Sequence, residues 1–218
     1  MPKEYCMRKL SFIDSLCASA DNALRTLAGG YQTTNRPSPA ANIEPTNLSA
    51  DEQRRVAGMM RINHCGEVCA QALYQGQAIT AKLPEVREKM EQSAKEENDH
   101  LHWCHQRLDE LNTHTSFLNP LWYAGSFSLG ALAGLAGDRW SLGFVAETER
   151  QVVKHLDKHL HQLPKEDQRS REILSVMKTD EQEHATAALE AGGTELPDTV
   201  KSAMSLMSKV MTKTVYYL

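Results

Sequence analysis

Residues 97–100 read Glu-Asn-Asp-His, and residues 181–184 repeat the pattern as Glu-Gln-Glu-His. Residues three apart lie on one face of an α-helix, so each stretch presents a carboxylate and an imidazole together. A single pair of this kind is usually exposed to solvent. Both stretches, however, lie within apolar patterns that alternate in steps of three and four, which predict helices packed against other helices.

Each Glu-x-x-His helix follows a helix whose apolar stripe is also interrupted by a glutamate. Glu67 precedes the break at Leu83-Pro84, and Glu149 precedes the break at Pro164. In each hairpin the two glutamates are about equally far from the turn, roughly 20 Å along helices that rise about 1.5 Å per residue. The carboxylates should therefore lie at one level. The four stripes are Val56, Met60, Asn63, Glu67, Ala70 and Tyr74; Met90, Glu97, Leu101, Cys104, Leu108 and Leu111; Leu142, Val145, Glu149, Val152, Leu156, His159 and Leu163; and Leu174, Met177, Glu181, His184 and Ala188.

Four carboxylates on inward-facing stripes require compensation, because an ionised carboxylate buried without a partner is costly. A metal cation would supply it. Glutamate and histidine together suit iron or manganese, and one Glu from each of two helices plus Glu-x-x-His from each of the other two is the di-metal pattern of carboxylate bundles. The sequence thus predicts an all-α, ferritin-like four-helix bundle with additional membrane-facing helices. The predicted metal ligands are Glu67, Glu97, His100, Glu149, Glu181 and His184.

The stretch from residue 116 to residue 137 contains no charged residue. About 20 apolar residues suffice to cross a bilayer, but Asn119-Pro120 and four glycines interrupt this stretch, and a crossing would place the two hairpins on opposite sides of the membrane. We expect a loosely packed, membrane-facing segment that admits a substrate, with Trp122 and Tyr123 as interfacial anchors. Ordinary packing in the core is the alternative.

Composition excludes some partners and favours one compartment. The formal net charge is −4 and no long Lys/Arg run occurs, so there is no electrostatic signature of a nucleic-acid-binding protein. The five cysteines form no Cys-x-x-Cys pair, which suits a reducing compartment. Residues 1–16 carry charges throughout and lack the apolar region of a secretory signal, so we expect a cytoplasmic location.

Other histidines and sulfur side chains offer weaker hypotheses. His64 with Cys65 and Cys69 could suggest zinc, but consecutive helical neighbours point apart and no second cluster completes a structural zinc site, so helix packing is favoured. His155 and His159 are either surface or packing residues, the favoured reading, or lie beside the metal or substrate. The methionines near the C-terminus are expected in the core. The histidines expected to be exposed or at a rim are His102, His105, His114 and His161.

Four strings resemble the demethoxyubiquinone hydroxylase family: residues 61–67 (RINHCGE), 95–100 (KEENDH), 147–149 (ETE) and 180–184 (DEQEH). The resemblance covers nearly all of residues 49–218. It implies that the six predicted ligands hold two iron ions per chain and that dioxygen is the co-substrate. It also implies hydroxylation of a polyprenylated methoxy-methyl-benzoquinol in ubiquinone biosynthesis, with electrons from NADH or from the quinol itself.

The resemblance further implies peripheral attachment to the cytoplasmic face of the cell membrane and allows a lipid-binding accessory protein as partner. A non-enzymatic, ferritin-like iron-storage protein is the alternative, since a fold does not determine function. The uncharged stretch between the hairpins and the cationic amphipathic tail favour the enzyme, because a storage protein working in water needs neither.

Capping signals and prolines predict the helix boundaries. A capping box at residues 49–52 begins one helix, and Pro84 begins the next. We expect residues 1–48 to form an N-terminal helix and flexible linker, and residues 49–218 to form the ferritin-like di-iron catalytic domain. The expected helices span about 12–27, 49–82, 84–112, 142–163, 166–191 and 197–218.

Overall fold

The computed structural model describes residues 12–218. Within this range every regular element is an α-helix, which confirms the all-helical prediction. Residues 1–11 lie outside the described residues. They include Cys6 and most of residues 1–16, the segment predicted to lack a secretory signal. The helices are α1 (Phe12–Ala28), α2 (Ala50–Thr80), α3 (Pro84–Glu110), α4 (Asn119–Leu135), α5 (Asp138–Gln162), α6 (Gln168–Glu190) and α7 (Asp198–Val215).

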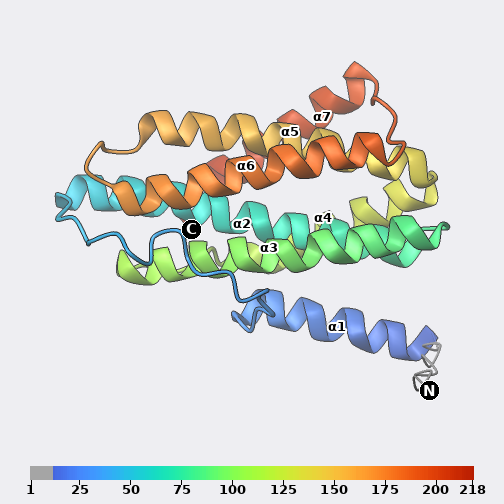
Figure 1. Ribbon diagram of the computed structural model, residues 1–218, viewed down its shortest axis with the longest axis horizontal. Coiled ribbons are helices and arrows are strands. Elements are labelled where there is room, and N and C mark those ends of the chain that lie inside the picture. The colour runs from blue at the N-terminus through green and yellow to red at the C-terminus, as the bar shows by residue number, and fades with distance from the viewer. Residues whose placement is uncertain (1–11) are drawn as a thin grey trace, which may run out of the picture.

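Two antiparallel hairpins, α2 with α3 and α5 with α6, lie against each other and form a helical bundle (Figure 1). Helix α4 packs along α2 and reaches α5, and it connects the hairpins. Helix α7 contacts α2 and α5, while α1 contacts α2 and α4. The division of the chain at residue 48 remains a prediction.

The six helices whose bounds were predicted begin and end close to the observed positions, whereas no bounds were predicted for α4. Ser49 caps α2 in a capping box with Glu52, and Pro84 lies in the first turn of α3. Helix α5 begins at Asp138, earlier than the expected Leu142. The Asp138 carboxylate accepts hydrogen bonds of 3.0 and 2.9 Å from two backbone N–H groups of the α2–α3 turn, so the start of α5 is fixed beside that turn.

Apolar layers lie on both sides of the level at which the glutamates occur. One layer includes Trp103 and Met177, and the other includes Tyr74 and Met90. Each bundle helix contributes to both layers and carries its stripe glutamate between them. Full burial of one large apolar side chain contributes roughly 1.5–3 kcal/mol, so these layers hold the glutamates inside the bundle.

The prediction that residues 116–137 are loosely packed was wrong. A Cβ atom added to Gly76 would lie 2.3 Å from the Phe127 carbonyl oxygen, and one added to Gly130 would lie 2.3 Å from the Leu73 carbonyl oxygen. Glycine therefore lets the backbones of α2 and α4 touch. Asn119 and the following proline begin α4 and do not interrupt it. Among residues 12–218, no helix combines the length and the hydropathy needed to cross a bilayer.

The two proposed interfacial anchors face inward. Tyr123 is buried, and its hydroxyl donates a 2.5 Å hydrogen bond to Gln75 Oε1. Trp122 is half-buried and lines a cavity between the helices. The close contact with α2 turns Trp122 and Tyr123 toward the bundle, so the exposed apolar side chains of α4 belong to other residues.

Candidate metal centre

Three helices bring four predicted ligands into one buried group. Glu67 comes from α2, Glu97 and His100 come from α3, and Glu181 comes from α6. Each offers one ligand atom, and these atoms lie within 4.8 Å of one another. At most 3% of any of these residues is exposed, so solvent does not screen their charges.

Two of the glutamates reach both histidines of the predicted ligand set. Glu97 Oε2 lies 3.2 Å from His100 Nδ1, and Glu97 Oε1 lies 3.2 Å from His184 Nδ1. Glu181 Oε1 lies 3.1 Å from His100 Nδ1, and Glu181 Oε2 lies 3.3 Å from His184 Nδ1. Each of these carboxylates therefore spans the space between a histidine of α3 and a histidine of α6.

Glu149 is buried on α5 but lies outside the four-residue group. The Tyr74 hydroxyl donates a 2.5 Å hydrogen bond to Glu149 Oε1. Glu147, the neighbouring acid, points elsewhere: its Oε1 accepts a 2.8 Å hydrogen bond from Gln151, and its Oε2 lies 3.9 Å from Lys201 Nζ on α7. Of the two acids, only Glu149 faces the interior of the bundle.

Burial and mutual repulsion change the protonation of the group. Burial, with the Glu97 charge, raises the pKa of Glu67, and burial with the Glu181 and Glu97 charges raises the pKa of Glu149. Burial opposes a charged imidazolium at His184, but the carboxylates of Glu181 and Glu97 outweigh it and raise the pKa of His184 to about 12. Protons therefore balance part of the negative charge when no metal is bound.

These pKa shifts predict that metal binding releases protons. At neutral pH the metal-free protein holds a proton on His184, whose pKa is about 12, and the raised pKa values of Glu67 and Glu149 favour their protonated forms. A ligand must lose its proton to bind a metal. Affinity for Co²⁺ should therefore increase between about pH 6 and pH 8. Calorimetry at one pH in buffers of different ionisation enthalpy measures the release, and binding without net proton release would contradict the expected protonation.

The donor atoms of this group and of the neighbouring Glu149 fit a bound metal cation. Glu97 Oε1, Glu149 Oε2 and Glu181 Oε1 are buried and lack a hydrogen bond. Glu97 Oε1 and Glu181 Oε1 each lie close to an imidazole nitrogen, but these contacts do not have hydrogen-bond geometry. A buried, unpaired carboxylate oxygen is costly, and a bound cation would remove that cost. Carboxylate and imidazole donors suit iron or manganese.

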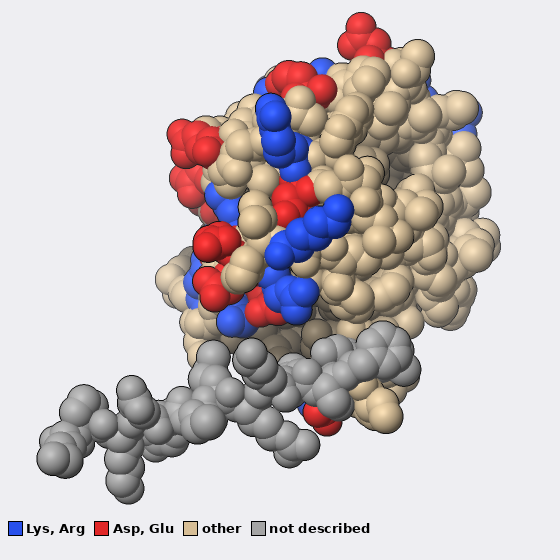
Figure 2. All heavy atoms as spheres, turned by 90° about the vertical axis from the view of Figure 1, so that its right-hand side faces the viewer, with Lys and Arg blue, Asp and Glu red and all other residues tan. Residues whose placement is uncertain are grey.

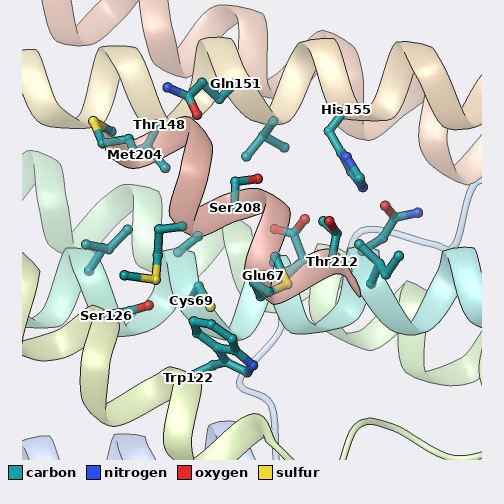
Figure 3. A pocket seen from close by; sticks show the side chains of 18 of the residues that line it. Glu67, Cys69, Trp122, Ser126, Thr148, Gln151, His155, Met204, Ser208 and Thr212 are labelled. Atoms are coloured by element: carbon teal, nitrogen blue, oxygen red, sulfur yellow. The ribbon is translucent and has the colours of Figure 1, made fainter. Parts of the chain in front are cut away.

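A largely apolar cavity of about 160 Å³ adjoins the group. Side chains from α2, α4, α5 and α7 point into it, and Glu67 is one of them (Figure 3). His155 also lines the cavity, and its buried Nε2 has no hydrogen-bond partner. Met204, Met207 and Met211 line this cavity. Met211 also packs against a buried apolar cluster, as expected for a core residue, whereas Met207 is 51% exposed.

Comparison with known proteins identifies the family. The model of the family described as ubiquinone biosynthesis protein COQ7 matches residues 54–215. The chain belongs to this family. Among COQ7 relatives, a protein of Nitrosococcus oceani is 57% identical over 211 residues, covering 97% of this chain and 99% of its own. A protein of Acinetobacter baumannii is 59% identical over 212 residues, which cover 97% of this chain and 100% of that protein. Both are named 3-demethoxyubiquinol 3-hydroxylase.

Two acids of this COQ7-family chain were not singled out from the sequence. Asp180 Oδ2 lies 2.9 Å from His100 Nε2, and Glu96 Oε2 lies 2.7 Å from His184 Nε2. Each acid immediately precedes the glutamate of one Glu-x-x-His motif and reaches the histidine of the other. A carboxylate at the far nitrogen orients an imidazole and leaves its near nitrogen free to bind a metal. The sequence signal for this role is the second acid that stands directly before each motif, in Glu96-Glu97 and in Asp180-Glu181.

The remaining histidines of the COQ7-family chain are mostly as expected. His64 is buried by packing. Neither His64 nor the neighbouring cysteines belong to the one group of possible metal ligands found among residues 12–218. His159 is buried and lies 2.9 Å from Asn63 Oδ1. His105 is half-buried, which fits the predicted rim position, and its Nδ1 lies 2.9 Å from the Tyr31 hydroxyl. The histidines confirmed as exposed are His102, His114 and His161.

Proposed function

We propose that this COQ7-family chain is a 3-demethoxyubiquinol 3-hydroxylase. It would be a di-iron monooxygenase on a ferritin-like bundle, and it would transfer one oxygen atom of dioxygen to a polyprenylated methoxy-methyl-benzoquinol. The curated relatives named as this hydroxylase match over nearly their full length. The observation that carries the proposal is structural: Glu97 and Glu181 each place one oxygen near each histidine, beside an apolar cavity.

The contacts suggest a role for each ligand. Glu67 and His100 would hold one iron, Glu149 and His184 would hold the other, and Glu97 and Glu181, which each face both histidines, would contribute ligand oxygens to the centre. Bound iron supplies the activation of dioxygen once it has been reduced, by NADH or by the quinol itself. No separate protein nucleophile is required.

The other residues of the site would orient the ligands and exclude water. Asp180 and Glu96 hold the far nitrogens of the two histidines, so the near nitrogens point at the glutamates. The apolar walls of the cavity would bind the quinol ring beside Glu67 and keep bulk water from it. An iron-storage protein has no need for such a cavity, and the curated relatives do not favour that function.

Single turnover tests the proposal. Metal-free protein is loaded anaerobically with Fe²⁺, mixed with a short-tailed demethoxyubiquinol and exposed to dioxygen. Mass spectrometry should detect a product heavier by one oxygen atom, while protein kept with a chelator should produce none. Consumption of dioxygen by the iron-loaded protein without any hydroxylated quinol would favour iron storage.

We also propose that the α4–α7 surface rests on the cytoplasmic face of the cell membrane. Its exposed apolar side chains lie on two of the four helices that wall the cavity, so a lipid-tailed quinol could pass between these two helices. Figure 2 shows one side of the molecule on which charged residues gather along one margin and uncharged residues cover a broad area. The exposed apolar residues are Phe117, Leu121, Leu129, Leu132 and Leu135 on or beside α4, and Leu206, Met207 and Val210 on α7.

Acidic substitutions on this surface should weaken membrane binding. Leu121 and Leu132 are 67% and 62% exposed and do not line the cavity, so Leu121→Glu and Leu132→Glu should leave turnover of a short-tailed quinol unchanged. Both variants should sediment less with anionic liposomes and process long-tailed quinol slowly. Leu83→Glu, at the 53% exposed leucine of the α2–α3 turn, is the control. Parent-like liposome binding by both α4 variants would contradict a membrane-facing α4.

A further inference from the structure

Residues 31–36, here called the strap, belong to the non-helical stretch between α1 and α2. They precede residue 54, where the match to the COQ7 family begins. The sequence suggested a loose linker here, yet side chains of the strap contact three helices of the bundle. These contacts lead from the surface to the imidazole of a proposed iron ligand.

Two strap residues attach it to α2 and α3. The Tyr31 hydroxyl lies 2.8 Å from His64 Nε2 and 2.9 Å from His105 Nδ1. The Thr34 backbone N–H donates a 2.8 Å hydrogen bond to Asp99 Oδ1, and the Thr34 hydroxyl donates a 2.5 Å hydrogen bond to Asp99 Oδ2. Asp99 is fully buried, so these bonds satisfy a carboxylate that water cannot reach.

Arg36 extends the strap to α6. Its guanidinium Nη2 donates a 2.8 Å hydrogen bond to Asp180 Oδ2, the oxygen that also lies 2.9 Å from His100 Nε2. The guanidinium carbon lies 5.0 Å from the centre of the Trp103 ring, and that ring lies 5.5 Å from the His100 ring. Asn35 turns the backbone just before Arg36 with φ of 67°, a left-handed conformation that asparagine tolerates better than most residues.

His100 and His184, the two histidines proposed as iron ligands, are oriented by acids that have different hydrogen-bond partners. Asp180 forms an ion pair with Arg36, which lies in the strap and outside the four bundle helices. Glu96, its counterpart at His184, accepts a 2.8 Å hydrogen bond from the neutral side chain of Gln92 on its own helix. A charge-assisted hydrogen bond is stronger than a neutral one. The His100 side of the centre therefore depends on the strap, while the His184 side does not.

We propose that Arg36 is a positioning residue that holds Asp180 against His100 and so maintains the geometry of one of the two metal sites. The proposal rests on the di-iron function. The Asp180 side chain is 18% exposed, so without Arg36 it can turn toward solvent. His100 then loses the acceptor that orients its ring, and its metal-binding nitrogen becomes less well placed.

Cobalt binding to metal-free, full-length protein tests this role without using activity. Anaerobic Co²⁺ titration of Arg36→Gln, followed by visible absorption, should show one site weakened roughly 3- to 10-fold and the other unchanged. That effect is smaller than the 10- to 100-fold loss typical of a direct partner of a ligand. Arg36→Lys keeps the charge without the planar fork and should restore part of the affinity. Arg25→Gln removes an exposed arginine paired with Asp21 within α1 and should titrate like the parent.

Each outcome of this titration decides the role of Arg36. Selective weakening in Arg36→Gln, with a thermal unfolding midpoint of the metal-free protein close to that of the parent, supports positioning, because an exposed ion pair stabilises a fold only slightly. Unchanged binding at both sites overturns the proposal and leaves the di-metal centre intact. Equal weakening at both sites overturns it as well, since it indicates general loosening. A parent protein that binds fewer than two cobalt ions overturns the proposed di-iron function and, with it, the role of Arg36.

Discussion

Glu181→Ala should lose iron and hydroxylation together. Glu181 places one oxygen near each histidine, so its removal takes a donor from both proposed metal sites. Loss of activity should exceed about 100-fold, because outer partners of metal ligands alone cost 10- to 100-fold. Iron analysis of the purified variant, alongside turnover of a soluble quinol, measures both effects. Glu97→Ala should behave in the same way, because Glu97 makes the equivalent contacts.

The fold should survive these substitutions, which makes the result interpretable. Glu97 still contacts both histidines in the Glu181→Ala variant, so the metal-free variant should remain folded, which its helical circular dichroism and a cooperative thermal transition check. Glu183→Ala is the matched control, since Glu183 lies two residues away on α6 and is exposed. Full iron occupancy in folded Glu181→Ala protein would disprove the ligand assignment.

Glu149→Gln should abolish hydroxylation, whereas Glu147→Gln should be mild. The amide oxygen of glutamine can keep the hydrogen bond from Tyr74 but has no negative charge to hold a cation. We expect a loss of more than about 100-fold for Glu149→Gln and less than about 3-fold for Glu147→Gln, whose side chain faces Gln151 and α7. Turnover and iron content of the two variants provide the comparison. The reverse order would mean that α5 presents the other acid to the metals.

The helices and the level of the glutamates could be predicted because both depend on local rules. The i, i+3 spacing of Glu97 and His100, the distance of each glutamate from its turn, and the breaks at Pro84 and Pro164 are properties of single helices or hairpins. The structure places Glu67, Glu97, His100 and Glu181 in one buried group, as those rules require.

The remaining features depend on how separate helices are rotated against each other. The bond between Asp180 and His100 requires a particular rotation of α6 relative to α3, which no hydrophobic period specifies. The inward turn of Tyr123 follows from the close contact of α4 with α2 at Gly76 and Gly130. The strap has no periodicity at all, so its contacts through Arg36 could be found only in three dimensions.

The iron dependence of a single turnover tests the central claim most directly. Metal-free protein is loaded anaerobically with increasing Fe²⁺, mixed with excess quinol and exposed once to dioxygen, and the hydroxylated product per chain is measured by mass spectrometry. If the four glutamates and two histidines hold a di-iron centre, product should rise until about two irons are bound per chain and then remain constant. A plateau at one iron per chain, or product that does not depend on iron, would contradict a di-iron monooxygenase.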